Sequence, residues 1–84
     1  MQIRHNRFKR ALAAGERQTG LWMALCSPTA AELIGGSGYD WLVLDTEHAP
    51  NELPGIVAQL RALEGAPAEP VVRPAWNDTV LIKR

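Results

Sequence analysis

The sequence predicts an α/β fold in which parallel strands alternate with helices. Three short apolar runs, at residues 19–25, 41–45 and 70–74, are each followed by a helical pattern or a helix-start signal. This alternation is typical of parallel βαβ units. Because their crossover connections are right-handed, the carboxyl ends of the three strands should meet at one edge of the sheet, where parallel α/β proteins bind ligands.

A short helix is expected before the first strand, over residues 6–14. Asn6 can cap its first turn and Gly15 can close its last. The run 19–25 then reads as a buried strand, because it is apolar and too short for a free-standing helix. Its end brings Cys26 and Ser27 to the ligand-binding edge of the predicted sheet.

Two overlapping signals mark the start of the second helix. Ser27 could cap it, with Pro28 in the first turn. Alternatively, Thr29 could cap it through a capping box with Glu32. Either helix should end in the glycine-rich segment 35–38.

The second strand, residues 41–45, is apolar and carries the β-branched Val43. A third helix should follow, with Asn51 as its cap and Pro54 in its first turn, where a missing N–H group is tolerated. Its apolar positions recur at helical spacing and form one face: Leu53, Ile56, Val57, Leu60 and Leu63.

The third strand, residues 70–74, is very short, and Asp78 can cap a final helix that starts at Thr79. Three parallel strands leave two open edges and part of the sheet uncovered. We therefore expect residues 1–84 to form a single partial domain at the amino-terminal end of a larger α/β protein.

Composition predicts a cytoplasmic protein without nucleic-acid or membrane partners. The formal net charge is zero and the nine basic residues are scattered, which disfavours a nucleic-acid surface. Cys26 is the single cysteine, so neither a disulfide framework nor a paired-cysteine zinc site is expected. The sequence shows no secretory-signal pattern and no apolar run of about 20 residues.

The second and third strands end in side chains that can carry acid/base chemistry. Asp45, Glu47 and His48 lie within four positions, and Arg73 ends the next strand. Histidine titrates near neutral pH, and an arginine fork can hold a carboxylate or a developing enolate. A plainer interpretation makes the first three residues turn formers or exposed loop residues. Arg73 is different, because a charge that ends an apolar strand needs a partner.

Metal binding and cysteine catalysis are weaker interpretations of these residues. Two carboxylates and a histidine could bind metal, but Asp-x-Glu-His is not a recognised ligand spacing. Cys26 has no helper base in the sequence. Tryptophans are by default core residues, and Trp22 and Trp76 are the candidates for lining a substrate pocket. Trp76 is the stronger candidate because it lies in a loop just after Arg73.

A resemblance to a known family covers nearly the whole chain. At Leu44–Asn51 the sequence is similar to the metal-dependent pyruvate aldolases of the 4-hydroxy-2-oxoheptanedioate aldolase / citrate lyase β-subunit (HpcH/HpaI) superfamily. The similar segments, in register, are Phe8-Lys9-Arg10-Ala11-Leu12, Gly20-Leu21-Trp22, Ala31-Glu32-Leu33, Gly38-Tyr39-Asp40-Trp41, Pro70-Val71-Val72-Arg73-Pro74 and Trp76-Asn77-Asp78. The Asp-x-Glu-His-Ala-Pro and Val-Arg-Pro motifs at this separation are specific.

The resemblance implies the first three β/α units of a TIM (β/α)8 barrel of roughly 250 residues, preceded by a short helix. It also implies reversible cleavage of a 4-hydroxy-2-oxo acid, such as 4-hydroxy-2-oxoheptanedioate, to pyruvate and an aldehyde. The implied cofactor is Mg²⁺, Mn²⁺ or Co²⁺, acting as a Lewis acid on pyruvate. A family-type homo-oligomer, a hexamer, is expected of the full-length protein.

The resemblance also assigns roles to the residues at the strand ends. His48 matches the base that acts on the substrate hydroxyl, and Arg73 matches the arginine that stabilises the oxyanion. Asp45 and Glu47 would lie near metal-bound water and support His48. The metal ligands themselves would lie beyond Arg84, so none is expected in this chain.

Two readings of the chain's function remain open. In the first, the chain is the amino-terminal part of an aldolase, an aldehyde-lyase acting in the catabolism of aromatic compounds. In the second, it is a truncated, non-catalytic fragment that associates with itself or with a complementary chain through its open strand edges. In both, the isolated chain is expected to be inactive.

Overall fold

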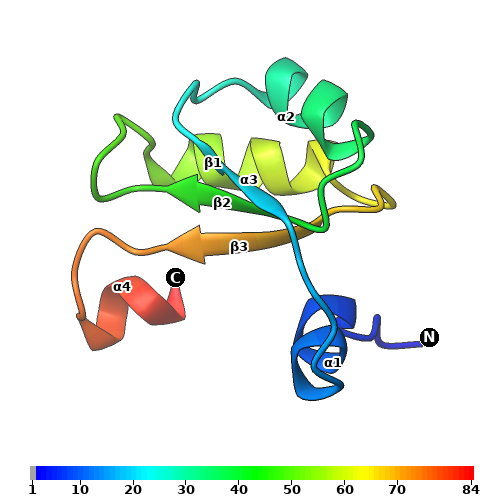
Figure 1. Cartoon of the computed structure of the whole chain (residues 1–84). Coiled ribbons are helices and arrows are strands. Elements are labelled where there is room, and N and C mark those ends of the chain that lie inside the picture. Colours follow the sequence, from blue (N-terminus) through cyan, green and yellow to red (C-terminus); the bar gives the residue numbers. More distant parts are fainter. Residues whose placement is uncertain (1) are drawn as a thin grey trace.

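A computed structural model describes residues 2–84 as a three-stranded sheet with four helices (Figure 1). The elements follow in the order α1 (Arg7–Ala13), β1 (Gly20–Met23), α2 (Pro28–Gly35), β2 (Trp41–Asp45), α3 (Leu53–Ala62), β3 (Glu69–Arg73) and α4 (Thr79–Lys83). The strands lie in the order β1-β2-β3, and both neighbouring pairs are parallel. The predicted sequence of one helix and three strand–helix units is confirmed.

Three helices begin at the predicted caps. The side chains of Asn6, Ser27 and Asp78 each accept a hydrogen bond from a backbone N–H in the first turn of the following helix. Ser27 is therefore the cap of α2, with Pro28 behind it, and the Thr29 alternative is wrong. Within residues 2–84, no helix has the length and apolar character needed to cross a membrane.

Asn51 does not cap α3, which corrects the prediction. The N-cap is Glu52, whose side chain makes no capping hydrogen bond. The Asn51 side chain instead donates from Nδ2 to the backbone oxygen of Asp45 at 2.6 Å. A buried acceptor at the end of β2 therefore takes the amide that would otherwise serve the helix. The first strand is also shorter than the run 19–25 that predicted it, ending at Met23.

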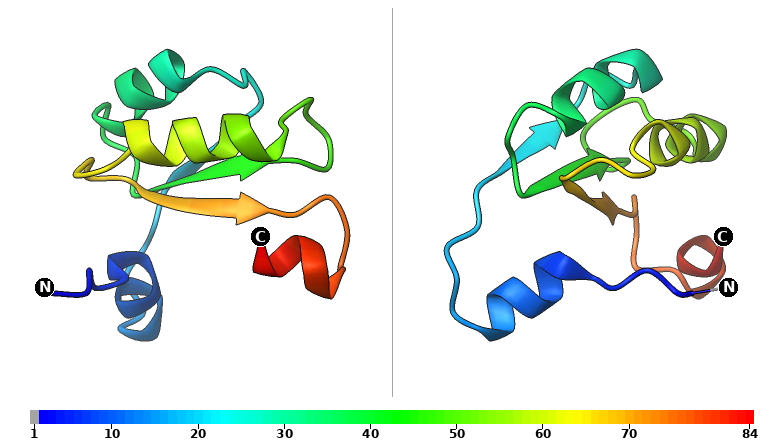
Figure 2. Two further views of the ribbon diagram at one scale, coloured as in Figure 1. Left: turned by 180° about the vertical axis from the view of Figure 1, so that it is seen from behind. Right: turned by 90° about the vertical axis from the view of Figure 1, so that its right-hand side faces the viewer.

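Helices α2 and α3 cover the same face of the sheet (Figures 1 and 2). Side chains alternate along a strand, and Leu42 and Leu44 of β2 point toward these helices. Both leucines are fully buried. The core cluster is Met23, Ala31, Leu42, Leu44, Ile56, Leu63 and Ala68. Hydrophobic burial on this face fixes how the strands are oriented.

The alternate positions of β2, which include Trp41 and Asp45, project to the opposite face. Helix α1 lies across the start of the strands on this side, and the ring centroids of Phe8 and Trp41 are 5.9 Å apart. Arg7 Nε also donates to Glu69 Oε1 at 2.7 Å, which ties α1 to the first residue of β3. The strand ends on this face remain clear of α1.

Gly20 allows the Trp41 indole to lie directly over β1, and its replacement should disturb this packing. A Cβ atom at Gly20 would lie 1.8 Å from the Trp41 ring. We expect Gly20→Ala to lower the free energy of unfolding by about 1–3 kcal/mol through overpacking. Urea unfolding followed by tryptophan fluorescence measures the change.

Gly55→Ala is the matched control, because nothing lies within 4 Å of a Cβ atom there and the residue is in α3. This change should be neutral or stabilise by about 0.5–1 kcal/mol. Equal effects of the two substitutions would contradict the account of Gly20.

Candidate active site

An arginine–aspartate fork joins the ends of β2 and β3. Asp45 and Arg73 are register partners, and their side chains face each other across the parallel pair. Arg73 Nε donates to Asp45 Oδ1 at 2.8 Å, and Arg73 Nη2 donates to Oδ2 at 2.6 Å. The sequence predicted that the charge of Arg73 needs a partner, and Asp45 is that partner. A bidentate pair of this kind fixes orientation as well as supplying attraction.

Further donors surround the Asp45 carboxylate, which is only 2% exposed. The indole Nε1 of Trp22, from β1, donates to Oδ2 at 3.2 Å. The backbone N–H groups of Glu47 and His48 donate to Oδ1 at 2.9 and 3.3 Å. The Arg73 guanidinium also lies over the Trp22 ring, 5.2 Å from its centroid, in a cation–π arrangement. All three strands therefore contribute to one charge cluster around the buried Asp45 carboxylate.

The cluster keeps Asp45 ionised. Its pKa lies well below the ordinary value of 3.8, chiefly because of the Arg73 hydrogen bonds and against the opposing effect of burial. In turn, Asp45 raises the pKa of Arg73. Because the Asp45 pKa is lower in the folded chain than in the unfolded one, the cluster stabilises the fold above pH 3.8. That stabilisation is lost as the pH falls below this value.

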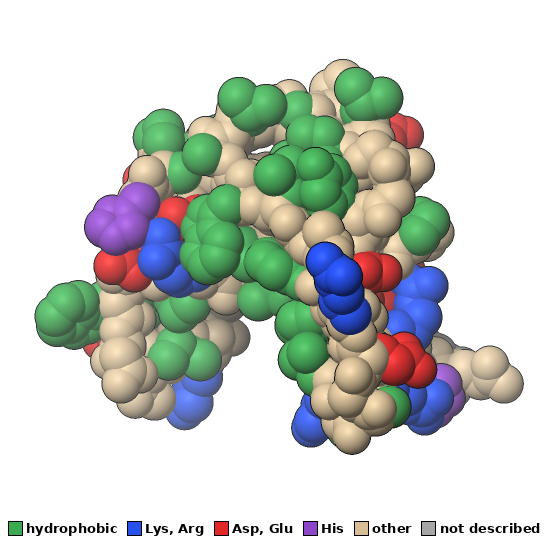
Figure 3. Space-filling view, viewed as in Figure 1, with side chains coloured by type: hydrophobic (Ala, Val, Ile, Leu, Met, Phe, Trp, Pro, Cys, Tyr) green, Lys and Arg blue, Asp and Glu red, His purple; other side chains and the backbone are tan. Residues whose placement is uncertain are grey.

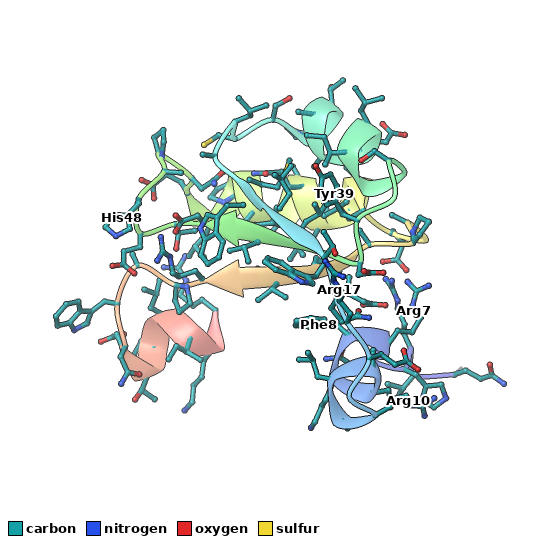
Figure 4. The ribbon with its side chains drawn as sticks, viewed as in Figure 1. Arg7, Phe8, Arg10, Arg17, Tyr39 and His48 are labelled. Carbon is teal, nitrogen blue, oxygen red and sulfur yellow. The ribbon has the colours of Figure 1, made fainter. Side chains whose placement is uncertain are left out.

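Glu47 and His48 form a second, exposed pair on the turn after β2 (Figure 4). His48 Nε2 lies 3.2 Å from Glu47 Oε1, and the His48 side chain is 71% exposed. The other Glu47 oxygen, Oε2, lies 3.6 Å from Arg73 Nε. Figure 3 shows a histidine gathered with acidic and basic side chains at the molecular surface, on the side where β2 and β3 end. The imidazole is thus accessible, and its acidic neighbour connects it to the buried fork.

The two tryptophans proposed for a substrate pocket lie in different surroundings. Trp22 supports the Asp45–Arg73 fork, as described, and half of its surface is exposed. Trp76 lies in the loop between β3 and α4 and is largely exposed. It lines a shallow hollow of about 400 Å³ together with Glu47 and Arg73. A pocket role for either tryptophan stays a prediction.

Cys26 and Ser27, also expected at this edge, make local contacts only. Cys26 Sγ lies 3.5 Å from the backbone oxygen of Ala24, and Ser27 caps α2. Neither side chain has a hydrogen bond to the Asp45 cluster among the contacts of residues 2–84.

Two contacts near this strand end were not predicted from the sequence. One is the bond from the Trp22 indole N–H to the Asp45 carboxylate, and the other is the link from Gln59, fully buried in α3, through Asn51 to the Asp45 backbone oxygen. A signal for Gln59 was present, because it lies three positions after Ile56 on the apolar face of the helix. A polar residue on such a face needs a hydrogen-bond partner.

The donor set of residues 2–84 does not fit a metal ion. No three His, Cys, Asp or Glu side chains in this part of the chain are placed to hold one. Both Asp45 oxygens accept from Arg73, and Glu47 is engaged with His48. A carboxylate that is committed to an arginine fork is a poor ligand.

The sequence matches the HpcH/HpaI aldolase/citrate lyase family over residues 18–84. It is 55% identical to a 4-hydroxy-2-oxo-heptane-1,7-dioate aldolase of Klebsiella pneumoniae, over 95% of this chain and 30% of that protein. It is 51% identical to a hydroxypyruvate/pyruvate aldolase of Pseudomonas aeruginosa, over 100% of this chain and 31% of that protein. The chain thus spans about a third of the length of these relatives.

The fold has a close counterpart among solved structures. A crystal structure of an HpcH/HpaI aldolase/citrate lyase family protein from Burkholderia cenocepacia superposes with a TM-score of 0.88 at 44% identity. The match covers 94% of this chain and 32% of that one. Because both the sequence match and the superposition extend over most of its length, the chain belongs to the HpcH/HpaI aldolase/citrate lyase family.

Proposed function

We propose that the chain supplies the proton-transfer and oxyanion-binding side of a divalent-metal-dependent aldolase. Its reaction would be the reversible cleavage of 4-hydroxy-2-oxo acids to pyruvate and an aldehyde. The observation that carries the proposal is the fork between the buried Asp45 carboxylate and the partly exposed Arg73, next to the exposed Glu47–His48 pair. Family membership and the names of the relatives support the reaction class. The parallel order β1-β2-β3 is compatible with the first units of a (β/α)8 barrel.

In this proposal His48 is the general base for cleavage. Glu47 Oε1 lies against Nε2, which favours the proton on that nitrogen and leaves Nδ1 to accept a proton. The base takes the proton of the C4 hydroxyl, the C3–C4 bond breaks, and its electron pair passes into the enolate of pyruvate. The aldehyde leaves, and protonation of the enolate at C3 gives pyruvate.

Arg73 would stabilise negative charge on the reacting oxygen. A guanidinium has five N–H donors, and the fork to Asp45 uses one on Nε and one on Nη2. The remaining donors can face a ligand in the hollow that Arg73 lines with Glu47 and Trp76. Asp45 therefore acts as the group that aims Arg73.

The divalent ion of the proposal would be held by residues outside 2–84, since the donor set described above does not fit it. Its ligands would approach the same edge of the sheet from later strands of a barrel, the edge at which barrel enzymes place their active sites.

A second candidate function is association without catalysis. β1 and β3 are the outer strands of the described sheet, so each leaves one backbone edge unpaired. An apolar groove of about 270 Å³ also lies between α3 and α4, lined by residues that include Leu53, Leu60 and Leu81. Sedimentation and thermal unfolding of the purified chain test this candidate. A chain that sediments as a monomer and unfolds cooperatively argues against association.

A chimera tests the aldolase proposal directly. The 84-residue chain would replace the matching segment of the Klebsiella pneumoniae relative, which supplies the remaining length. We expect the chimera to release pyruvate from 4-hydroxy-2-oxoheptanedioate with Mg²⁺, Mn²⁺ or Co²⁺, and the 84-residue chain alone to release none. Lactate dehydrogenase coupling measures pyruvate. Metal-dependent release by the chain alone, or a folded but inactive chimera, would contradict the proposal.

Substitution of His48 in the chimera separates its role from that of a surface residue. We expect His48→Ala to lower the rate of aldol cleavage by about 10²–10⁴-fold, the usual contribution of a general base. Proton exchange at the methyl group of pyruvate should fall much less, because it does not involve the C4 hydroxyl.

His5→Ala is the control, since His5 is exposed and, within residues 2–84, its side chain bonds Arg10, which lies at the other end of the molecule from His48 (Figure 4). It should leave both rates unchanged. Equal loss of cleavage and exchange in His48→Ala would move the role of His48 to enolisation.

A further inference from the structure

Two buried side-chain amides link α3 to the last residue of β2. Asn51 Nδ2 donates to the backbone oxygen of Asp45 at 2.6 Å, and Gln59 Nε2 donates to Asn51 Oδ1 at 2.8 Å. Gln59 is 0% exposed and Asn51 is 5% exposed. A continuous hydrogen-bonded path, here called the amide relay, therefore runs from the interior of α3 to the strand end that carries the candidate site.

The Asp45 backbone oxygen determines which way the two side-chain amides of the relay are oriented. The Asp45 carbonyl oxygen can only accept, so Asn51 must turn its NH₂ group toward it. This places Asn51 Oδ1 toward α3, where Gln59 must then present its own NH₂ group. The same Gln59 nitrogen donates to the backbone oxygen of Gly55 at 3.1 Å, which agrees with that orientation.

Packing alone does not account for Gln59. Its Oε1 atom is buried and has no hydrogen-bond partner among residues 2–84. An unpaired buried amide oxygen is costly, whereas a methionine of similar shape would carry no such cost. The neighbouring helical position on the same face is occupied by Ile56, which is buried and apolar. What distinguishes Gln59 is the donor it offers to Asn51.

The relay holds one end of Asp45 while the site holds the other. The Asp45 carboxylate binds Arg73 and the N–H groups of Glu47 and His48. The Asp45 carbonyl binds Asn51. Rotation of the peptide unit after Asp45 would break the Asn51 bond and draw the Glu47 and His48 N–H groups away from the carboxylate. The same unit is held from β3, because the N–H and Oγ1 groups of Thr46 donate to the backbone oxygen of Arg73 at 3.1 and 2.6 Å. The start of the turn that bears His48 is therefore held from two sides, by Arg73 of β3 and by the donor that Asn51 and Gln59 supply from the side of α3.

We propose that Asn51 and Gln59 are positioning residues that fix the turn of residues 46–48 through the backbone carbonyl of Asp45. Their contribution to catalysis rests on the proposed aldolase function, whereas the coupling of the relay to the turn does not. The two can therefore fail separately, because the coupling is measured here without any reaction.

Hydrogen exchange of the 84-residue chain, followed residue by residue by NMR, tests the coupling. In Gln59→Met we expect the backbone amides of Glu47 and His48 to exchange about 3- to 10-fold faster, as expected for loss of one hydrogen bond. The amide of Leu44, within β2, should keep its protection relative to the wild-type chain. Ile56→Val, one turn earlier in α3, is the control and should leave the ratio of turn to strand protection unchanged.

Unchanged exchange at Glu47 and His48 in Gln59→Met would overturn the proposal. So would a proportional loss of protection in the turn and in β2, which would show a merely structural role. If Gln59→Met does not fold, side-chain amide exchange in the wild-type chain tests the relay instead. The side-chain amide protons of Asn51 should then exchange far more slowly than those of the exposed Asn77, and equal rates would overturn the relay.

Discussion

A buried carboxylate at the end of β2 is the constraint on which the site depends. Asp45 is almost completely removed from solvent, and an ionised group in that position is tolerated only when its hydrogen bonds are satisfied. Arg73 and Trp22 supply donors from the two neighbouring strands, and the turn supplies two backbone N–H groups. The interactions that compensate the charge therefore also set the relative positions of three strand ends and the histidine turn.

The alternation of side chains along β2 places the core residues on one face of the sheet and the charged cluster on the other. Leu42 and Leu44 enter the core under α2 and α3, whereas Trp41 and Asp45 face the opposite side. A shift of one residue in register would exchange these sets, so the hydrophobic core that selects the register also selects which face carries the charged cluster. Gln59 connects the helix layer to the sheet, because it bonds Asn51, which in turn bonds the last residue of β2.

Much of this arrangement could be predicted from the sequence, because it follows from periodicity and handedness. Alternating strand and helix patterns predicted the parallel sheet and the shared edge of its strand ends, and the place of Arg73 at the end of an apolar strand predicted that it needs a charge partner. The side-chain bonds of Trp22 and Asn51 could not be predicted in this way. The first depends on the register between β1 and β2, and the second on competition between a helix terminus and a buried carbonyl, which only tertiary packing decides.

A titration of Asp45 tests the central claim most directly. Carboxyl ¹³C NMR of the 84-residue chain should show a pKa below 3.8, with the Trp22 indole N–H and Arg73 Nε–H resonances shifting in the same transition. The free energy of unfolding should fall as the pH drops below 3.8, and Asp45→Asn should remove that dependence. An Asp45 carboxyl that titrates at its ordinary value, without a response from Trp22 or Arg73, would contradict the account.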